Sequence, residues 1–321
     1  MTAPTSSRVL RLAGLAVVLI AAILAPRVFY PVFLMKALCF ALFACAFNLL
    51  LGYTGLLSFG HAAFFATSGY LAGYLIKQQA FTPGLGILAG TLAAATLGFI
   101  VGNLVVRRQG IYFSMITLAL AQLVYFVYLQ ASFTGGEDGL QAIPRGRLFW
   151  VINLENDKTL YYVVLAIFLF GVWLVRRTIH SPFGQVLKAI RENEARAVSL
   201  GYDVNRYKVA AFVISAALTG LAGATKALVF TFVTLTDADW HTSGDVVLMS
   251  LLGGMGTVTG PIVGAFSIVT LEHQLSDKVG PFVTVIIGAI FMVCVLVFRR
   301  GMVGEFAALY RRVVGRREDG H

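Results

Sequence analysis

The sequence predicts an all-helical bundle that crosses a membrane many times. Of its 321 residues 58% are hydrophobic and only 12% are charged, and its mean hydropathy is +0.83. The apolar residues gather in stretches close to the ~20 residues that a spanning helix needs. The basic residues gather in short runs beside these stretches. We therefore expect an all-α polytopic membrane protein with about 8 to 10 transmembrane segments, not a soluble domain.

The apolar stretches give the expected spans in chain order. They cover residues 10–29, 32–51, 61–76, 84–106, 110–131, 160–175, 208–233, 244–272 and 281–298. The first stretch follows two arginines, as the apolar core of a signal peptide also does. Because many more apolar stretches follow, we expect residues 1–30 to remain as an N-terminal transmembrane helix, with cleavage near Ala25 as the alternative. Residues 31–298 then form the transmembrane domain, and residues 299–321 form a basic tail.

The basic residues predict the orientation of the spans. They cluster before the first span, at Arg107 and Arg108, between residues 176 and 208, and after residue 298. Cytoplasmic loops carry an excess of Lys and Arg, so these regions and both termini are expected on the cytoplasmic side. The loop over residues 132–159 then lies outside. This topology accounts for the formal net charge of +10 without nucleic acid as a partner.

The longest charged segment, from Ser181 to Lys208, predicts an amphipathic helix of about 18 residues. Ser181 suits the N-cap, Pro182 the first helical position, and Gly201 a left-handed stop. Such a helix is too polar to span a bilayer, so it lies on the membrane face or docks into a partner. The alternative is a helix that only covers the ends of other helices.

Two glycine-broken segments predict interrupted helices. If both its flanks are outside, the stretch over 244–272 must enter the membrane and return, and the sequence LLGGMGTVTGPIVG supplies the break. A similar interruption follows Asn48, and broken segments in two related halves are typical of a central substrate path. An ordinary helix with a proline kink is the alternative for 244–272.

Polar residues and glycines at the two breaks are the candidate lining of that path. A small solute could bind their side chains and freed backbone amides. The alternative is that they satisfy the backbone of the broken helices themselves. The candidates are Asn48, Thr54, Ser58, His61, Gly253, Gly254, Gly256 and Gly260.

No motif in the chain predicts an enzyme. The five His residues are scattered, and neither metal-ligand spacing nor a nucleophile with its base is evident. A phosphate-binding GxxxxGK[ST] loop is absent as well, so a partner subunit must bind any ATP and Mg that power transport. We expect no cofactor and no metal in this chain.

Ionisable residues within the expected spans are the candidates for an ion or proton pathway. They are Lys36, His61, Lys226, Asp245, Glu272 and His273. Lys36, Asp245 and Glu272 lie towards the ends of their stretches, which leaves no carboxylate at the centre of a helix. Because burying charge in a membrane is costly, a proton relay would require ionisable groups that are kept within the spans for function. Without a carboxylate at a helix centre, the sequence does not favour a proton relay.

Four stretches together resemble a known family. They are NLLLGYTGLLSFGHAAFFATSGYLAGYL from residue 48, RRQGIYFSMITLALAQ leading to FTGGEDGLQAIP, SPFGQVLKAIRENEARAVSLGYDVNRYKVAAFVISAALTGLAGATKAL, and LLGGMGTVTGPIVGA. In combination they resemble the permease subunits of branched-chain amino acid ABC importers of the Liv type, particularly the M-like subunit. The resemblance covers roughly residues 48–275.

The resemblance implies partners and a docking loop. The partners are a second related permease, two cytoplasmic ATP-binding subunits and a periplasmic or lipid-anchored solute-binding protein. The loop over 176–208 would dock into the ATPase, as the EAA loop of ABC importers does. Glu194, Ala195 and Gly201 match the EAA pattern loosely, because Gly201 follows Glu194 by seven residues and no Leu-Pro pair closes the pattern. The expected coupling residues are Phe183, Leu187, Arg191, Glu192, Glu194, Ala195, Arg196 and Gly201.

The expected function is therefore permeation in an ATP-driven importer of the bacterial inner membrane. Branched-chain or related hydrophobic amino acids are the expected solutes. Permeases for urea, short amides or aromatic acids are an alternative within the same machinery. A self-sufficient secondary transporter or channel is the alternative from another class.

Overall fold

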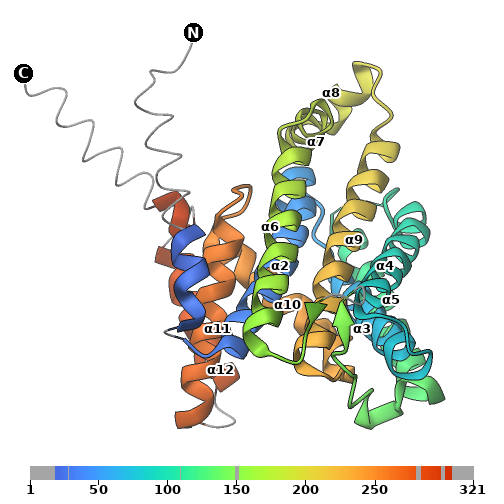
Figure 1. Cartoon of the computed structure of the whole chain (residues 1–321). Helices are drawn as coiled ribbons and strands as arrows, with labels where there is room; N and C mark the ends of the chain where they lie inside the picture. The colour runs from blue at the N-terminus through green and yellow to red at the C-terminus, as the bar shows by residue number, and fades with distance from the viewer. Residues whose placement is uncertain are drawn as a thin grey trace, which may run out of the picture.

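The computed structural model describes residues 19–27, 29–108, 110–148, 152–279, 283–297 and 301–305, and it confirms the all-helical fold (Figure 1). The longer helices are α2 (Pro31–Thr54), α3 (His61–Gln78), α4 (Pro83–Val105), α5 (Ile111–Gln130), α6 (Asp157–Ile179), α9 (Val204–Phe230), α10 (Trp240–Gly253), α11 (Gly260–Val279) and α12 (Val283–Val297). The shorter ones are α7 (Pro182–Glu192) and α8 (Glu194–Ser199). Among the described residues, strands are limited to a hairpin of β1 (Arg147–Leu148) and β2 (Ile152–Asn153).

Five of these helices are long and apolar enough to cross a membrane: α2, α4, α5, α6 and α9. Their bounds lie within about four residues of the predicted stretches, and α6 extends the stretch 160–175 at both ends. The predicted first span, 10–29, falls largely outside the described residues, which are helical over 19–24. The predicted tail, 299–321, is described only over 301–305.

The bundle has two distinct ends, which Figure 1 shows at the top and bottom of the view. One end carries α7 and α8 and is called here the α7–α8 end. The opposite end carries the loop between α5 and α6 and the segment 231–239. There Leu140 and Val233 exchange two backbone hydrogen bonds of 2.9 Å, which tie these connections together.

Helices α2 and α9 form the centre of the bundle. In the most apolar 18-residue window of each helix, 83% of the residues are buried in α2 and 78% in α9, but only 22% in α5. A helix that is apolar on all sides belongs in such a position, whereas the exposed apolar side chains of α5 suit lipid or a partner helix. Small residues let α4 approach this centre closely: a Cβ on Gly90 would lie 2.5 Å from the carbonyl oxygen of Ser68 in α3.

The stretch over 244–272 turns back on itself, as predicted, and the alternative of one kinked helix is wrong. Helix α10 runs from the opposite end to Gly253, and α11 returns from Gly260 to Val279. A Cβ on Gly264 would collide with the carbonyl oxygen of Met249, so glycine allows the two helices to pack closely. At 14 residues, or about 21 Å, α10 is too short to span a bilayer.

The segment after Ser181 forms two helices, so the prediction of one continuous helix was wrong. The predicted ends are correct: the Ser181 side chain accepts a hydrogen bond from the Gly184 amide at 3.3 Å, and Gly201 has a φ of +86°. Asn193 interrupts the helix with an extended backbone at φ −158° and ψ 100°. Its side chain accepts from the Arg196 amide, because asparagine competes well as an N-cap.

Candidate functional site

The second break, residues 254–259 between α10 and α11, meets the C-terminal half of α2 inside the bundle, where the Asn48 side chain holds it. Its Nδ2 donates to the Thr257 carbonyl at 2.8 Å, and its Oδ1 accepts from the Gly256 amide at 3.0 Å. The Tyr53 hydroxyl donates to the Gly256 carbonyl at 2.8 Å. The backbone freed between α10 and α11 is thus held by side chains of α2.

Glycine is required where α2 touches the second break. A Cβ on Gly52 would lie 2.7 Å from the backbone nitrogen of Gly256, closer than real atoms approach. Gly254 and Gly256 have φ values of +120° and +74°, which side chains disfavour. A Cβ on Gly253 would collide with the backbone of Gly260. The predicted glycines therefore act through close packing and turn geometry.

The first break, residues 55–60, is satisfied by α5 and α10. Thr117 accepts from the Phe59 amide at 3.2 Å, and Ser114 donates to the Leu57 carbonyl at 2.7 Å. Ser243 accepts from the Ala62 amide at 2.8 Å and so caps α3. None of the three was predicted from the sequence; Ser114 and Thr117 are marked only by a hydroxyl within an apolar stretch, and Ser243 lies in a polar segment with no distinguishing signal.

The other predicted path residues bond within the protein. Thr54 donates to the Leu50 carbonyl, and Ser58 accepts from the Gly60 amide. The His61 Nε2 lies 2.9 Å from the Ser215 hydroxyl, which donates to the Ala46 carbonyl, so the histidine nitrogen is the donor of this pair. All these side chains are buried, as their role in satisfying the broken backbone requires. Their contact with a solute remains a prediction.

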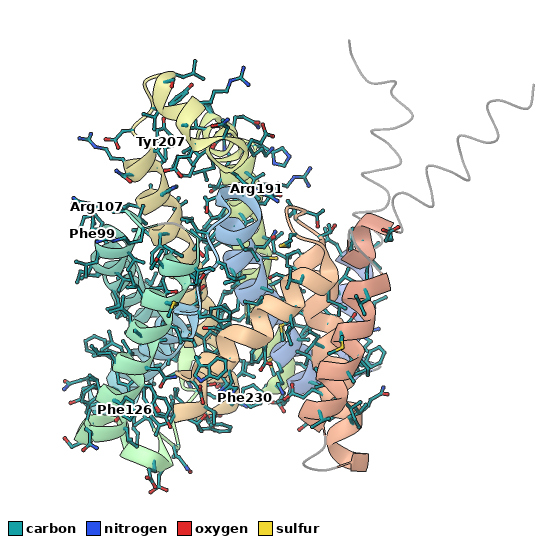
Figure 2. The ribbon with its side chains drawn as sticks, turned by 180° about the vertical axis from the view of Figure 1, so that it is seen from behind. Phe99, Arg107, Phe126, Arg191, Tyr207 and Phe230 are labelled. Atoms are coloured by element: carbon teal, nitrogen blue, oxygen red, sulfur yellow. The ribbon has the colours of Figure 1, made fainter. Side chains whose placement is uncertain are left out.

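Arg191 connects α7 to the point where α2 meets the second break. Its guanidinium donates to the Gly52 carbonyl and lies beside Gly256, and Figure 2 shows it where α7 meets the upper end of α2. Lys188, one turn earlier, lies 5.9 Å from the Tyr53 ring centroid. The sequence analysis expected Arg191 to face a partner, and the structure gives it a bond to its own bundle.

The other predicted coupling residues divide between two faces. Leu187 is fully buried, Phe183 stacks on Tyr207 at 5.5 Å, and Glu194 pairs with Lys208 at 2.7 Å, so these three side chains anchor the pair α7–α8. Glu192, Ala195, Arg196 and Gly201 are exposed.

Three apolar side chains beside these exposed residues were missed by the sequence analysis. Val198, Leu200 and Tyr202 are exposed by 57%, 68% and 41%. They form the tip of the α7–α8 end, where an exposed apolar patch is typical of a protein contact. No helical periodicity marks them, because two of them lie beyond the end of α8.

A cavity of ≈ 850 Å³ lies at the opposite end, between α2, α9, α10, α11 and α12; we call it the mouth cavity. Four of the candidate residues for an ion pathway line this cavity: Lys36, Lys226, Asp245 and Glu272. Lys226 pairs with Asp237 at 2.7 Å and Lys36 with Glu272 at 3.1 Å. Asp245 lines the cavity from α10, so the charges of this cavity come from four helices, α2, α9, α10 and α11, and from the segment before α10.

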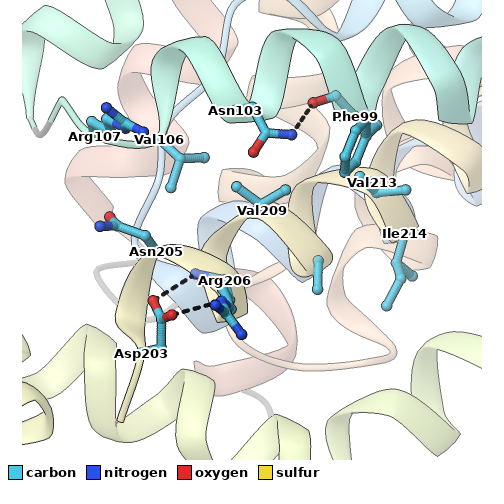
Figure 3. A pocket seen from close by; sticks show the side chains of 11 residues that line it. Phe99, Asn103, Val106, Arg107, Asp203, Asn205, Arg206, Val209, Val213 and Ile214 are labelled. Carbon is cyan, nitrogen blue, oxygen red and sulfur yellow. Dashed lines mark hydrogen bonds and ion pairs between the residues drawn. The ribbon is translucent and has the colours of Figure 1, made fainter.

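A second cavity, of ≈ 710 Å³, lies between α4 and α9 near the α7–α8 end (Figure 3). Its polar groups bond within their own helices: Asp203 pairs with Arg206 at 2.8 Å, and Asn103 donates to the Phe99 carbonyl at 2.8 Å. Asp203, Arg206 and Asn103 are therefore engaged by neighbours in their own segments, whereas Arg107 and Asn205 line the cavity as well.

The fold and the site define a class of protein: a multi-pass helical membrane protein in which a central helix, α2, holds the break between α10 and α11 and is itself bonded to an amphipathic helix pair. The family can be stated as well. The chain belongs to the family described as branched-chain amino acid transport system / permease component, whose model matches residues 31–297.

Individual relatives agree with this family. The chain is 30% identical over 72% of its length to the high-affinity branched-chain amino acid transport system permease protein LivM of Escherichia coli, and it spans 60% of that relative. It is 32% identical over 58% of its length to the autoinducer 2 import system permease protein LsrC of Klebsiella pneumoniae, spanning 53% of it. It is 26% identical over 59% of its length to the ribose import permease protein RbsC of Haemophilus influenzae, spanning 58% of it. No solved structure matches the chain.

Replacing Asn48 with leucine is expected to release the break between α10 and α11. The Asn48→Leu variant leaves the Gly256 amide and the Thr257 carbonyl without their partners, at a cost of about 1 to 3 kcal/mol each. Hydrogen exchange measured by mass spectrometry should then accelerate at least about tenfold over residues 254–259. Asn103→Leu is the matched control, since Asn103 bonds only its own helix. Equal exchange in both variants would contradict the role given to Asn48.

Proposed function

We propose that the chain is the membrane-spanning permease subunit of an ATP-driven importer of branched-chain or related hydrophobic amino acids. The contact from Arg191 in α7 to the Gly52 carbonyl carries this proposal. It gives a docking loop a direct mechanical connection to the breaks that line the proposed path. The family supports the same conclusion, because the matched model is that of a transport permease component.

The proposed complex contains further subunits. They are a second related permease, two ATP-binding subunits that also bind Mg, and a periplasmic or lipid-anchored solute-binding protein. The chain itself is then not an enzyme. The proposed location is the bacterial inner membrane, with both termini and the α7–α8 end in the cytoplasm, as the clusters of Lys and Arg favour.

The proposed mechanism is alternating access controlled at the two breaks. Asn48 and Gly256 lie between the mouth cavity and the α7–α8 end, so their contact closes the path in the described conformation. A nucleotide-driven movement of the ATPase would shift α7, and Arg191 would transmit the shift to Gly52. Such a switch requires that the ATPase bind the two conformations with different affinities.

The substrate and the energy source are tested together by uptake. We expect the chain, assembled with its partner subunits in liposomes, to take up labelled L-leucine only when ATP and the binding protein are supplied. Ribose serves as the competing probe, because a relative carries the name of a ribose permease. Uptake by the chain alone would identify a self-sufficient transporter, and ATP-driven uptake of ribose but not leucine would identify another importer.

Removing the Arg191 guanidinium is expected to uncouple the complex without dissociating it. In the Arg191→Met variant the bond to the Gly52 carbonyl is lost, so ATP hydrolysis should continue while leucine uptake falls at least about fivefold, the ratio that ~1 kcal/mol of a lost hydrogen bond predicts. Arg108→Met is the matched control, because the Arg108 side chain is exposed and lies outside the docking loop of residues 176–208. If uptake and hydrolysis remain coupled in Arg191→Met, the transmission step is wrong.

A charge on the apolar tip is expected to prevent docking of the ATPase. Leu200→Asp would place a carboxylate in the interface, and the ATP-binding subunits should no longer co-purify with the chain. Gln79→Asp adds the same group on an exposed residue at the opposite end and should leave assembly intact. Undiminished co-purification of Leu200→Asp would exclude the tip from the interface.

A further inference from the structure

The mouth cavity combines charges of both signs with aromatic surface. On the described residues Lys36 and Lys226 supply two positive charges, and Asp237, Asp245 and Glu272 supply three negative ones. Charged groups within a membrane bundle are costly and mark functional sites by default. The cavity therefore requires an explanation that packing alone does not give.

The two ion pairs of the cavity differ in accessibility. Lys226 and Asp237 are each 9% exposed and bonded at 2.7 Å, and Asp237 also accepts from the Thr234 amide. This pair is fixed within the wall. Lys36 and Glu272 are 31% and 46% exposed, so their mutual attraction is weak and a ligand can separate them at small cost.

Asp245 is the carboxylate that remains. Among the residues that the structure describes, no Lys or Arg forms an ion pair with it, although it lies within the electrostatic reach of Glu272, His241 and Lys36. Asp245 and Glu272 thus present two carboxylates beside one accessible ammonium group. A ligand that brings its own cation as well as an anion would balance this arrangement.

The apolar walls indicate the rest of the ligand. Phe40 on α2, Phe232 after α9, and Leu248, Met249 and Ile268 on α10 and α11 line the same cavity. Met249 is 2% exposed and Ile268 7%, so they form the apolar floor. A branched aliphatic side chain fits such a surface, with the charged groups above it fixing the orientation.

We propose that the mouth cavity is a binding site for a zwitterionic α-amino acid with an apolar side chain. Its ammonium group lies between Asp245 and Glu272, its carboxylate faces Lys36, and its side chain rests on the apolar floor. The ligand exchanges the weak pair of Lys36 and Glu272 for two charge-assisted contacts of its own. A neutral sugar carries no cation for Asp245. This site deepens the proposed function and rests on it for the transport step.

The test is direct binding to the purified full chain in lipid nanodiscs, without the solute-binding protein. The probes are L-leucine, 4-methylpentanoate, which lacks the ammonium group, leucinamide, which lacks the carboxylate, and ribose. Leucine should bind more tightly than the other three. Asp245→Asn should weaken leucine about tenfold and leave 4-methylpentanoate unchanged, because only leucine uses the missing charge. Glu272→Gln should show the same selective loss.

Matched controls separate the site from a general effect on folding. Asp239→Asn alters an acid that lies beside the cavity and pairs with His241, and Lys77→Met alters a lysine of the same end that bonds Gln141. Both should bind leucine as the wild type does, whereas Lys36→Met should weaken leucine and spare leucinamide. Equal loss of leucine and 4-methylpentanoate in Asp245→Asn would overturn the proposal, as would tighter binding of ribose than of leucine.

The binding experiment tests the site and the uptake experiment tests the importer, so each proposal can be overturned while the other stands. If the assembled complex takes up leucine with ATP but the chain alone binds none of the probes, the site is wrong and the importer stands. If the chain binds leucine through Asp245 and the complex shows no ATP-driven uptake, the site stands and the importer is wrong.

Discussion

The two hydrogen bonds of the Asn48 side chain are the interaction on which the rest of the structure depends. A helix that turns back inside a membrane protein leaves backbone groups that lipid cannot satisfy. Asn48 satisfies a donor at Gly256 and an acceptor at Thr257 with one amide. Leucine, of similar size, could do neither, so the position of α10 and α11 depends on the chemistry of this side chain on α2.

The same face of α2 extends this interaction towards both ends of the bundle. Residues four apart lie above one another on a helix, and Lys36, Phe40, Ala44, Asn48 and Gly52 follow that spacing. Lys36 reaches Glu272, the Ala44 carbonyl accepts from Ser250 at 3.4 Å, and the Gly52 carbonyl accepts from Arg191. One buried helix thus contacts the mouth cavity, the break at residues 254–259 and α7.

Charge is placed differently at the two ends. At the α7–α8 end, the bond of Glu194 to Lys208 holds the amphipathic helices to α9, while apolar groups at the tip remain exposed. At the opposite end, Lys226 and Asp237 are buried and Asp245 is left for other partners. The α7–α8 end therefore suits a protein partner through its exposed apolar groups, and the charged groups of the opposite end suit a small charged solute.

The sequence by itself determined five apolar spans, the turn at residues 254–259, the cap at Ser181 and the stop at Gly201, because apolar run length, glycine and proline act locally on the backbone. It did not reveal that Asn193 divides the amphipathic helix, since an asparagine cap competes with helix continuation by a small margin. Only the tertiary structure decided that Asn48 reaches Gly256, that Ser114, Thr117 and Ser243 satisfy the first break, and that Lys36, Asp245 and Glu272 share one cavity. These residues are distant along the chain, and a hydrogen bond or charge pair between distant residues depends on how the helices pack, which no local pattern records.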